Sequence, residues 1–151
     1  MEQIKKKPQK ILWATDFSGR SRSVLPFITS QLRDEGADIH LLYVIPDIAN
    51  KKDPWYGEFT PRHANRIVRQ EKAAAQKRLD QLCIKYLGGC ARFTKHTAVG
   101  DPAREILKLI EKEKMDMVVM ARRKPHIPDI REGTLERVKR MARVPVKLIE
   151  T

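Results

Sequence analysis

The stretch Asp116-Met117-Val118-Val119-Met120-Ala121 decides the fold class, together with the residues that follow it as far as Gly133-Thr134. Its apolar residues predict a buried strand. We expect a basic loop at Arg122-Arg123-Lys124 and the opening of a helix at Gly133-Thr134. In a parallel α/β sheet, ligands bind outside the carboxyl ends of the strands, at this kind of junction. A helix that opens with Gly-Thr offers free backbone N–H groups and a hydroxyl to an anion. This junction is therefore the first candidate binding site.

Strand-like and helix-like segments alternate along the rest of the chain. Nearly continuous apolar runs predict strands covered on both faces, and apolar residues at helical spacing predict amphipathic helices. The order βαβαβαβαβ predicts an α/β fold, with one doubly wound domain over residues 1–151, a parallel sheet and right-handed crossovers. The expected strands are 11–15, 39–45, 91–99, 116–121 and 146–149, and the expected helices begin near Ser23, Ala64, Pro102 and Leu135.

Three local features refine this prediction. Gly100-Asp101-Pro102 joins an N-cap residue to a proline at the first helical position, which is typical of a helix start. Pro26 would kink a helix that began at Ser18, so we expect the first helix to begin near Ser23. The segment 91–99 alternates only weakly, which indicates a strand at the edge of the sheet.

Residues 46–63 interrupt the regular pattern with three prolines and a glycine. A loop of this length in a compact domain usually indicates function or disorder. Trp55, Tyr56 and Phe59 favour an ordered loop that packs as a lid or contacts a partner.

Length and composition restrict the class of protein. A chain of 151 residues with 41% hydrophobic residues fits one globular domain, and no apolar run approaches the ~20 residues needed to span a bilayer. We see no export signal, so we expect a cytoplasmic protein without membrane insertion. The two cysteines, Cys83 and Cys90, suit a reducing compartment. The net charge of +12 keeps polyanions among the expected partners.

Six short motifs occur in an order that resembles the universal stress protein family, and together they cover essentially the whole chain. No single motif is specific, but the ordered set is. The motifs are Thr15-Asp16-Phe17-Ser18, Tyr43-Val44-Ile45-Pro46, Val99-Gly100-Asp101-Pro102, Asp116 to Met120, Gly133-Thr134 and Val144-Pro145-Val146.

The resemblance implies a five-stranded parallel sheet in the order 3-2-1-4-5 with helices on both faces, like Rossmann and adenine-nucleotide α-hydrolase folds. It also implies a homodimer, commonly formed through the last strand, and a role in stress response. Family members divide into adenine-nucleotide binders and non-binders. By the resemblance, Asp16 would lie near adenine and ribose, the Val44 backbone would contact adenine, and Gly133 and Thr134 would contact phosphate.

The loop after the fourth strand departs from the pattern of the binders. That pattern is Gly, two residues, Gly, nine residues, then Gly with Ser or Thr. Ala121 stands at the first glycine, Lys124 at the second, and only eight residues separate Lys124 from Gly133. A Cβ at either position obstructs close approach of the backbone to phosphate, and the prolines at 125 and 128 remove N–H donors. We therefore expect adenine-nucleotide affinity to be weak or lost, with ATP or AMP binding as the alternative.

Each candidate site residue also has a purely structural explanation. Asp16 suits a turn or N-cap carboxylate, which we favour slightly, and Val44 suits a buried strand. Gly133-Thr134 suits an ordinary helix start equally well. The cations of Arg122-Arg123-Lys124 would attract an anion to this helix terminus even without the glycines, although such clusters are usually solvated.

Catalysis finds little support in the sequence. The four histidines, His40, His63, His96 and His126, are scattered, and none has a triad-like spacing to Ser, Asp or Cys. No Cys/His set has zinc-like spacing, so we expect no metal, and Cys83 is expected in the core. We do not expect an enzyme, and a nucleotide hydrolase is the least favoured hypothesis.

A basic helix between Arg62 and Lys85 supports a hypothesis of a different class. Its seven cations suit a solvated helix face, but clustered Lys and Arg are also typical of surfaces that bind nucleic acid or another polyanion. We therefore expect a cytoplasmic dimeric binding protein in stress response. The alternative is a basic interaction protein that docks on nucleic acid or another anionic partner.

Overall fold

A five-stranded parallel sheet forms the centre of the molecule in the computed structural model, which describes residues 9–15, 23–45, 52–53, 57–58, 61–86, 88, 93–122 and 133–150. The strand order is β5-β2-β1-β6-β7, so the predicted order 3-2-1-4-5 is confirmed. The strands are β1 (Lys10–Ala14), β2 (Asp38–Ile45), β5 (Phe93–Val99), β6 (Met117–Arg122) and β7 (Val146–Glu150). The helices are α1 (Leu25–Glu35), α2 (Pro61–Tyr86), α3 (Pro102–Lys112) and α4 (Thr134–Met141).

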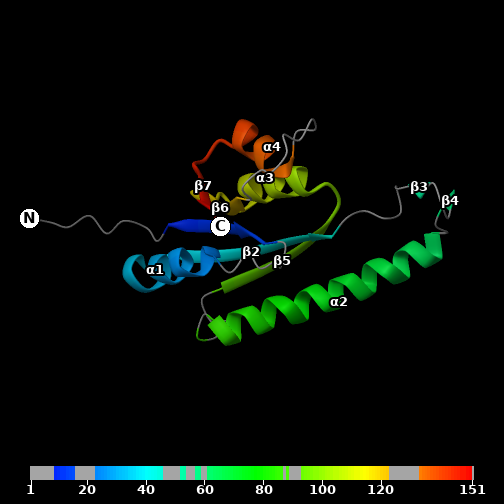
Figure 1. The fold of residues 1–151 in the computed structure, drawn as a ribbon, viewed down its shortest axis with the longest axis horizontal. Coiled ribbons are helices and arrows are strands. Elements are labelled where there is room, and N and C mark those ends of the chain that lie inside the picture. The colour runs from blue at the N-terminus through cyan, green and yellow to red at the C-terminus, as the bar shows by residue number, and fades with distance from the viewer. Residues whose placement is uncertain are drawn as a thin grey trace, which may run out of the picture.

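Helices cover both faces of the sheet, as Figure 1 shows: α1 and α2 lie on one side, and α3 and α4 on the other. Side chains alternate along each strand, so β1 sends Ile11 and Trp13 to the core under α1 and α2, and Leu12 to the core under α3 and α4. All three are fully buried. This two-sided burial explains why the strands read as nearly continuous apolar runs.

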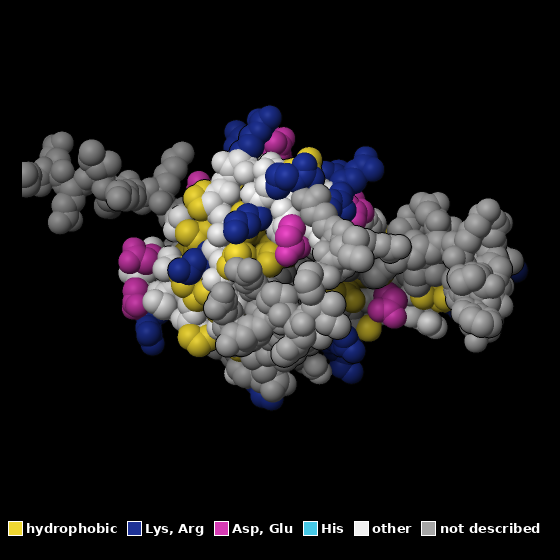
Figure 2. Space-filling model, turned by 45° about the horizontal axis from the view of Figure 1, so that its top comes forward, with side chains coloured by type: hydrophobic (Ala, Val, Ile, Leu, Met, Phe, Trp, Pro, Cys, Tyr) yellow, Lys and Arg dark blue, Asp and Glu magenta, His cyan; other side chains and the backbone are white. Residues whose placement is uncertain are grey.

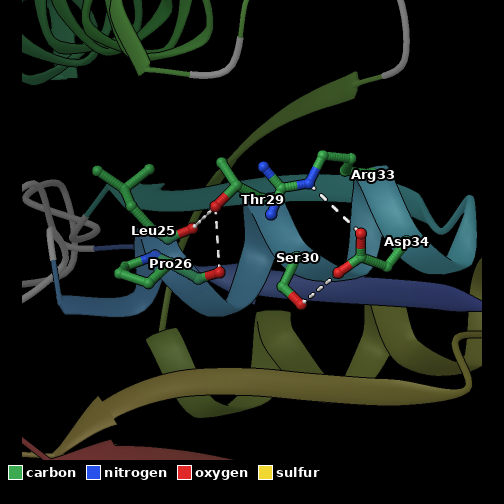
Figure 3. Close-up of polar contacts among 6 residues, drawn as sticks. All are labelled: Leu25, Pro26, Thr29, Ser30, Arg33 and Asp34. Atoms are coloured by element: carbon green, nitrogen blue, oxygen red, sulfur yellow. Dashed lines mark hydrogen bonds and ion pairs between the residues drawn. The ribbon is translucent and has the colours of Figure 1, made fainter.

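The start of α1 resolves the conflict that Pro26 poses in the sequence. The helix begins at Leu25, which puts the proline in the first turn, where its missing N–H costs nothing. The N-cap residue, Val24, provides no side-chain cap. Within the helix, the Thr29 hydroxyl oxygen lies 2.7 Å from the carbonyl oxygen of Leu25, to which it donates, and 3.1 Å from that of Pro26 (Figure 3).

The segment 46–63 differs from the prediction in two respects. Helix α2 begins at Pro61, inside the expected loop, because proline is well suited to the first position of a helix. Two short strands, β3 (Lys52–Asp53) and β4 (Gly57–Glu58), pair antiparallel upstream of it. Trp55, Tyr56 and Phe59 lie outside the described residues.

Helix α2 continues past the sheet at its N-terminal end, as Figure 1 shows. Its first buried residue among those described is Ala75, followed by Leu79 and Cys83, so the expectation of a core Cys83 is confirmed. An ion pair between Asp80 and Lys95 ties this second half of the helix to β5. Within the described residues, no helix is long and apolar enough to cross a membrane.

Helix α3 begins as its sequence predicts. Asp101 is the N-cap residue, and its carboxylate accepts a hydrogen bond from the Arg104 N–H at 3.2 Å. Gly100 has a φ of +148°, a conformation that L residues rarely adopt. The strand before it, β5, lies at one edge of the sheet, as expected, and β7 lies at the other.

Candidate functional site

The carboxyl ends of the parallel strands bring several predicted site residues to one edge of the sheet. Val44 lies near the end of β2, Ala121 near the end of β6, and Gly133 immediately before α4. Two backbone hydrogen bonds hold this edge, from Thr15 N to Leu42 O and from Gly100 N to Ile45 O, each 2.9 Å. The edge is therefore built by five segments that are separate in the sequence.

The predicted nucleotide contacts divide into those the structure describes and those it does not. The described residues are Val44, Ala121, Gly133 and Thr134, together with the backbone of Arg122, which pairs with Glu150 in the sheet. The predictions for Asp16, Arg123 and Lys124 fall outside the described residues.

Val44 and Ala121 are both half-buried, and they pack toward opposite faces of the sheet. Val44 contacts the core under α3 and α4, whereas Ala121 contacts the core under α1 and α2. The Val44 backbone pairs with Ala98 of β5. Packing thus explains both side chains without a ligand, and only their backbone groups remain relevant to nucleotide contact.

The N-terminus of α4 already carries an anionic group of the chain itself. Gly133 is the N-cap residue with extended backbone angles, φ −76° and ψ 173°, and no side chain caps the helix. A Cβ added at Gly133 would lie only 2.7 Å from Oε2 of Glu136. The Glu136 carboxylate is therefore folded back against the first turn, where the helix dipole favours negative charge.

Arg137, the next residue of α4, is held by α3. Its guanidinium lies 2.9 Å from one carboxylate oxygen of Asp101 and donates to the other at 3.0 Å. This hydrogen bond lowers the pKa of the Asp101 carboxyl below its usual value, and the Arg104 N–H acts in the same direction. Asp101 therefore caps α3 and anchors α4 at once.

A cluster that the sequence analysis missed lies further from the carboxyl edge, between β2 and β5. Nδ1 of His40 lies 2.8 Å from Nε2 of His96, and Nε2 of His40 lies 3.3 Å from the carboxylate of Asp38. His40 is only 5% exposed. Fifty-six residues separate the two histidines, so only the pairing of the two strands brings them together.

The 2.8 Å contact excludes N–H groups on both facing ring nitrogens, Nδ1 of His40 and Nε2 of His96. In the arrangement with two neutral rings, His40 donates from Nε2 to Asp38 and its Nδ1 accepts from Nε2 of His96. Burial lowers the pKa of His96, and the charges of His40 and Lys112 lower it further, whereas Glu113 opposes them. Within the ranges that the structure describes, no three His, Cys, Asp or Glu side chains are placed to hold a metal ion.

Comparison with known proteins agrees with this architecture. The universal stress protein family model matches residues 7–149. The structure of hypothetical protein MJ0577 is similar with a TM-score of 0.76 and 22% identity, over 95% of this chain and 96% of that one. The universal stress protein UspA from Lactobacillus plantarum gives a TM-score of 0.74 at 18% identity, over 95% and 99%.

A third similar structure contains a nucleotide. It is the universal stress protein from Archaeoglobus fulgidus in complex with dAMP, with a TM-score of 0.61 and 20% identity over 93% of this chain and 97% of that one. At such identities these likenesses concern the fold alone. The family match spans nearly the whole chain and agrees with the strand order and the sequence motifs, and the chain therefore belongs to the universal stress protein family.

Proposed function

We propose that the protein acts in stress response as a cytoplasmic, homodimeric binding protein whose affinity for adenine nucleotides is weak or lost. Nothing in the described residues suggests a catalytic base with a nucleophile beside it, so the proposal does not include nucleotide hydrolysis. A phosphate-release assay with ATP is expected to give only the background rate.

The position of Glu136 is the observation that carries the proposal of weak nucleotide affinity. A phosphate group at the start of α4 would need the free N–H groups and positive end of that helix. The Glu136 carboxylate lies against the same turn and repels a second anion. Ala121 and Lys124 add to this effect, because they replace the two glycines that would let the backbone approach phosphate.

The family relationship supports the alternative, in which ATP or AMP binds. The Archaeoglobus fulgidus protein was solved with dAMP, so the same fold accommodates an adenine nucleotide in that relative. In this chain, the residues available for such binding are Val44 and Gly133-Thr134 at the carboxyl edge. The family resemblance adds Asp16, and the sequence adds the cations of Arg122-Arg123-Lys124.

Titration of the ¹⁵N-labelled protein with ATP, AMP and dAMP, followed by NMR, distinguishes the two possibilities. We expect only weak shifts for the unaltered protein. Glu136→Gln should bind about two- to fivefold more tightly, because it removes a charge that interacts with the helix dipole by about 0.3–1 kcal/mol. Glu71→Gln, which removes an exposed charge on α2, serves as the control.

Two results would contradict this reasoning. Micromolar affinity in the unaltered protein would show that the site is intact. Equal affinities for Glu136→Gln and the unaltered protein would show that this carboxylate does not exclude phosphate.

The homodimer part of the proposal rests on the family resemblance and on the position of β7. This strand lies at the edge of the sheet, and within the described part of the chain only β6 pairs with it. A second copy that added its own β7 across a two-fold axis would satisfy the backbone groups of the open edge. Light scattering at high concentration should give twice the monomer mass, and a monomer would contradict the proposal.

The exposed arginines of α2 favour a second candidate function, docking on a nucleic acid. Arg62, Arg66 and Arg69 recur at i, i+4 and i+7, so they share one face of the part of α2 that precedes its first buried residue. All three are exposed. Such a row matches the electrostatic character of a phosphate backbone.

Binding to a short DNA duplex at several salt concentrations tests this candidate. Each arginine that neutralises a phosphate contributes about 0.9 to the slope of log K against log salt, so Arg66→Glu with Arg69→Glu should lower the slope by roughly 2. Lys139→Glu on α4 is the control. Binding that does not depend on salt would refute the candidate.

A further inference from the structure

A groove between α3 and α4 has an apolar floor that is open to solvent. Leu107 and Ile110 line it from α3, and Met141 and Ala142 line it at the end of α4. Its volume is about 540 Å³, and Met141 is 54% exposed. Volumes of roughly 300–1,000 Å³ are typical of pockets that hold small organic molecules. The floor is aliphatic, so it suits a hydrocarbon chain better than a nucleobase.

Two ion pairs between the helices bracket the groove. Arg137 joins Asp101 at the start of α3 at 2.9 Å, and Arg143 approaches Glu111 near its end at 3.8 Å. Asp101 and Glu111 are ten residues apart, which corresponds to roughly 15 Å along a helix. The apolar floor lies between these two contacts. The groove therefore runs along α3 and α4 from their first turns, next to the carboxyl edge of the sheet, to their C-terminal ends.

The rim of the groove is strongly basic. Four cations line it, from Arg104, Lys108, Arg137 and Arg143, and Glu111 is the one carboxylate among the lining residues, while Asp101 and Glu105 pair with Arg137 and Lys108 from outside the lining. Arg104 forms no ion pair with any residue that the structure describes. The contact of Lys108 with Glu105 is 3.9 Å long and exposed on the lysine side, so it holds Lys108 only weakly. Figure 2, with the α3 and α4 side turned forward, shows Lys and Arg side chains interspersed with hydrophobic ones.

We propose that this groove binds an amphiphile with an alkyl chain and one anionic head group, a carboxylate or a phosphate. The chain would lie on Leu107, Ile110 and Met141, and the head group would pair with Arg104 and Lys108, which are one helical turn apart on α3. The proposal does not depend on nucleotide binding at the carboxyl edge, because none of Val44, Ala121 and Gly133-Thr134 lines the groove.

Calorimetric titration with octanoate, decanoate and decyl phosphate below their micellar concentrations tests the proposal, with decanol and decyltrimethylammonium as uncharged and cationic counterparts. We expect one site per chain, with affinity rising by up to about fourfold for each added CH₂. The uncharged and cationic compounds should bind at least about tenfold more weakly, because they lack the charge that the basic rim complements.

Variants assign the binding to the groove. Arg104→Glu reverses the charge of an exposed rim residue, and Met141→Glu places a carboxylate on the floor. Each should weaken decanoate binding at least about fivefold, whereas Lys139→Glu, on α4 but outside the groove, should leave it unchanged. Urea unfolding of each variant confirms that it folds.

Four outcomes would overturn the proposal. The first is that decanol binds as tightly as decanoate, and the second is that binding appears only above the micellar concentration. The third is that Arg104→Glu and Met141→Glu leave the decanoate affinity unchanged. The fourth is that Met141→Glu breaks a dimer while the unaltered protein does not bind decanoate at all. The last would identify the groove as a contact between two copies of the chain.

Discussion

Lowering the pH from about 8 to about 5.5 should destabilise the protein through the pair formed by His40 and His96. With both imidazoles neutral, Nε2 of His96 donates to Nδ1 of His40, and the chain of hydrogen bonds continues to Asp38. If both rings are protonated, two N–H donors face each other across 2.8 Å. The hydrogen bond is then lost, and two positive charges repel each other beside a strand pair.

The sign of the effect follows from the lowered pKa of His96. In the folded state this pKa lies below its ordinary value of 6.5, chiefly because of burial. Between the folded and unfolded values, the unfolded chain binds more protons, so stability rises with pH in that window. The contribution of His96 to stability is fully present at pH values above its pKa in the unfolded chain, and it decreases as the pH falls toward its pKa in the folded protein. For one proton, the slope cannot exceed about 1.4 kcal/mol per pH unit.

The assay is urea unfolding at a series of pH values, followed by fluorescence, since Trp13 is fully buried in the core. The free energy of unfolding should decrease on acidification in the unaltered protein, and less steeply in His96→Gln. His63→Gln, which removes an exposed histidine from α2, is the control and should retain the full slope. Equal slopes for His96→Gln and the unaltered protein would refute the reasoning.

A second variant tests the hydrogen bond separately from its titration. His96→Ala removes the partner of Nδ1 in His40, a side chain that is 5% exposed. At neutral pH this should cost about 1–3 kcal/mol, the usual penalty for an unsatisfied buried polar group. A cost within the error of the measurement would show that water replaces His96.

Two further predictions concern the start of α3. Gly100→Ala should lower the free energy of unfolding in urea by about 1–3 kcal/mol, because φ is +148° and the new Cβ would lie 3.0 Å from the Glu105 carboxylate. The control Gly36→Ala, with φ +63° and open space around it, should lower it less. Asp101→Ala should lower the free energy of unfolding by about 0.5–2 kcal/mol, because it removes the N-cap of α3, whereas Asp101→Asn should retain most of the stability. Equal losses in the two variants would assign the effect to the ion pair with Arg137 instead.

Local sequence signals sufficed for most of the fold because their causes are local. Buried strands read as apolar runs, and Asp101-Pro102 marks a helix start through its own side chain and ring. The early start of α2 at Pro61 escaped prediction, since Pro61-Arg62-His63 adds nothing to the apolar stripe by which the rest of the helix is recognised. The edge position of β5 was correctly predicted from its weak alternation.

The candidate sites were less accessible to sequence reasoning. The order of motifs indicated the carboxyl edge, but the Glu136 carboxylate at the N-terminus of α4 follows from a side-chain conformation that no motif specifies. The groove between α3 and α4 depends on the separation and relative position of two helices. No sequence pattern of either helix alone reports that spacing.

The sequence by itself determined the class of fold and the starts of α3 and α4, because each depends on residues close together in the chain. The strand order followed from the family resemblance of the ordered motifs, and the basic character from the composition of the whole chain. Only the tertiary structure decided which distant groups meet. His40 and His96 look like scattered histidines until β2 and β5 pair in parallel, and Asp101 looks like a simple cap until α4 brings Arg137 beside it. These contacts depend on register and packing, which arise from the folded chain as a whole.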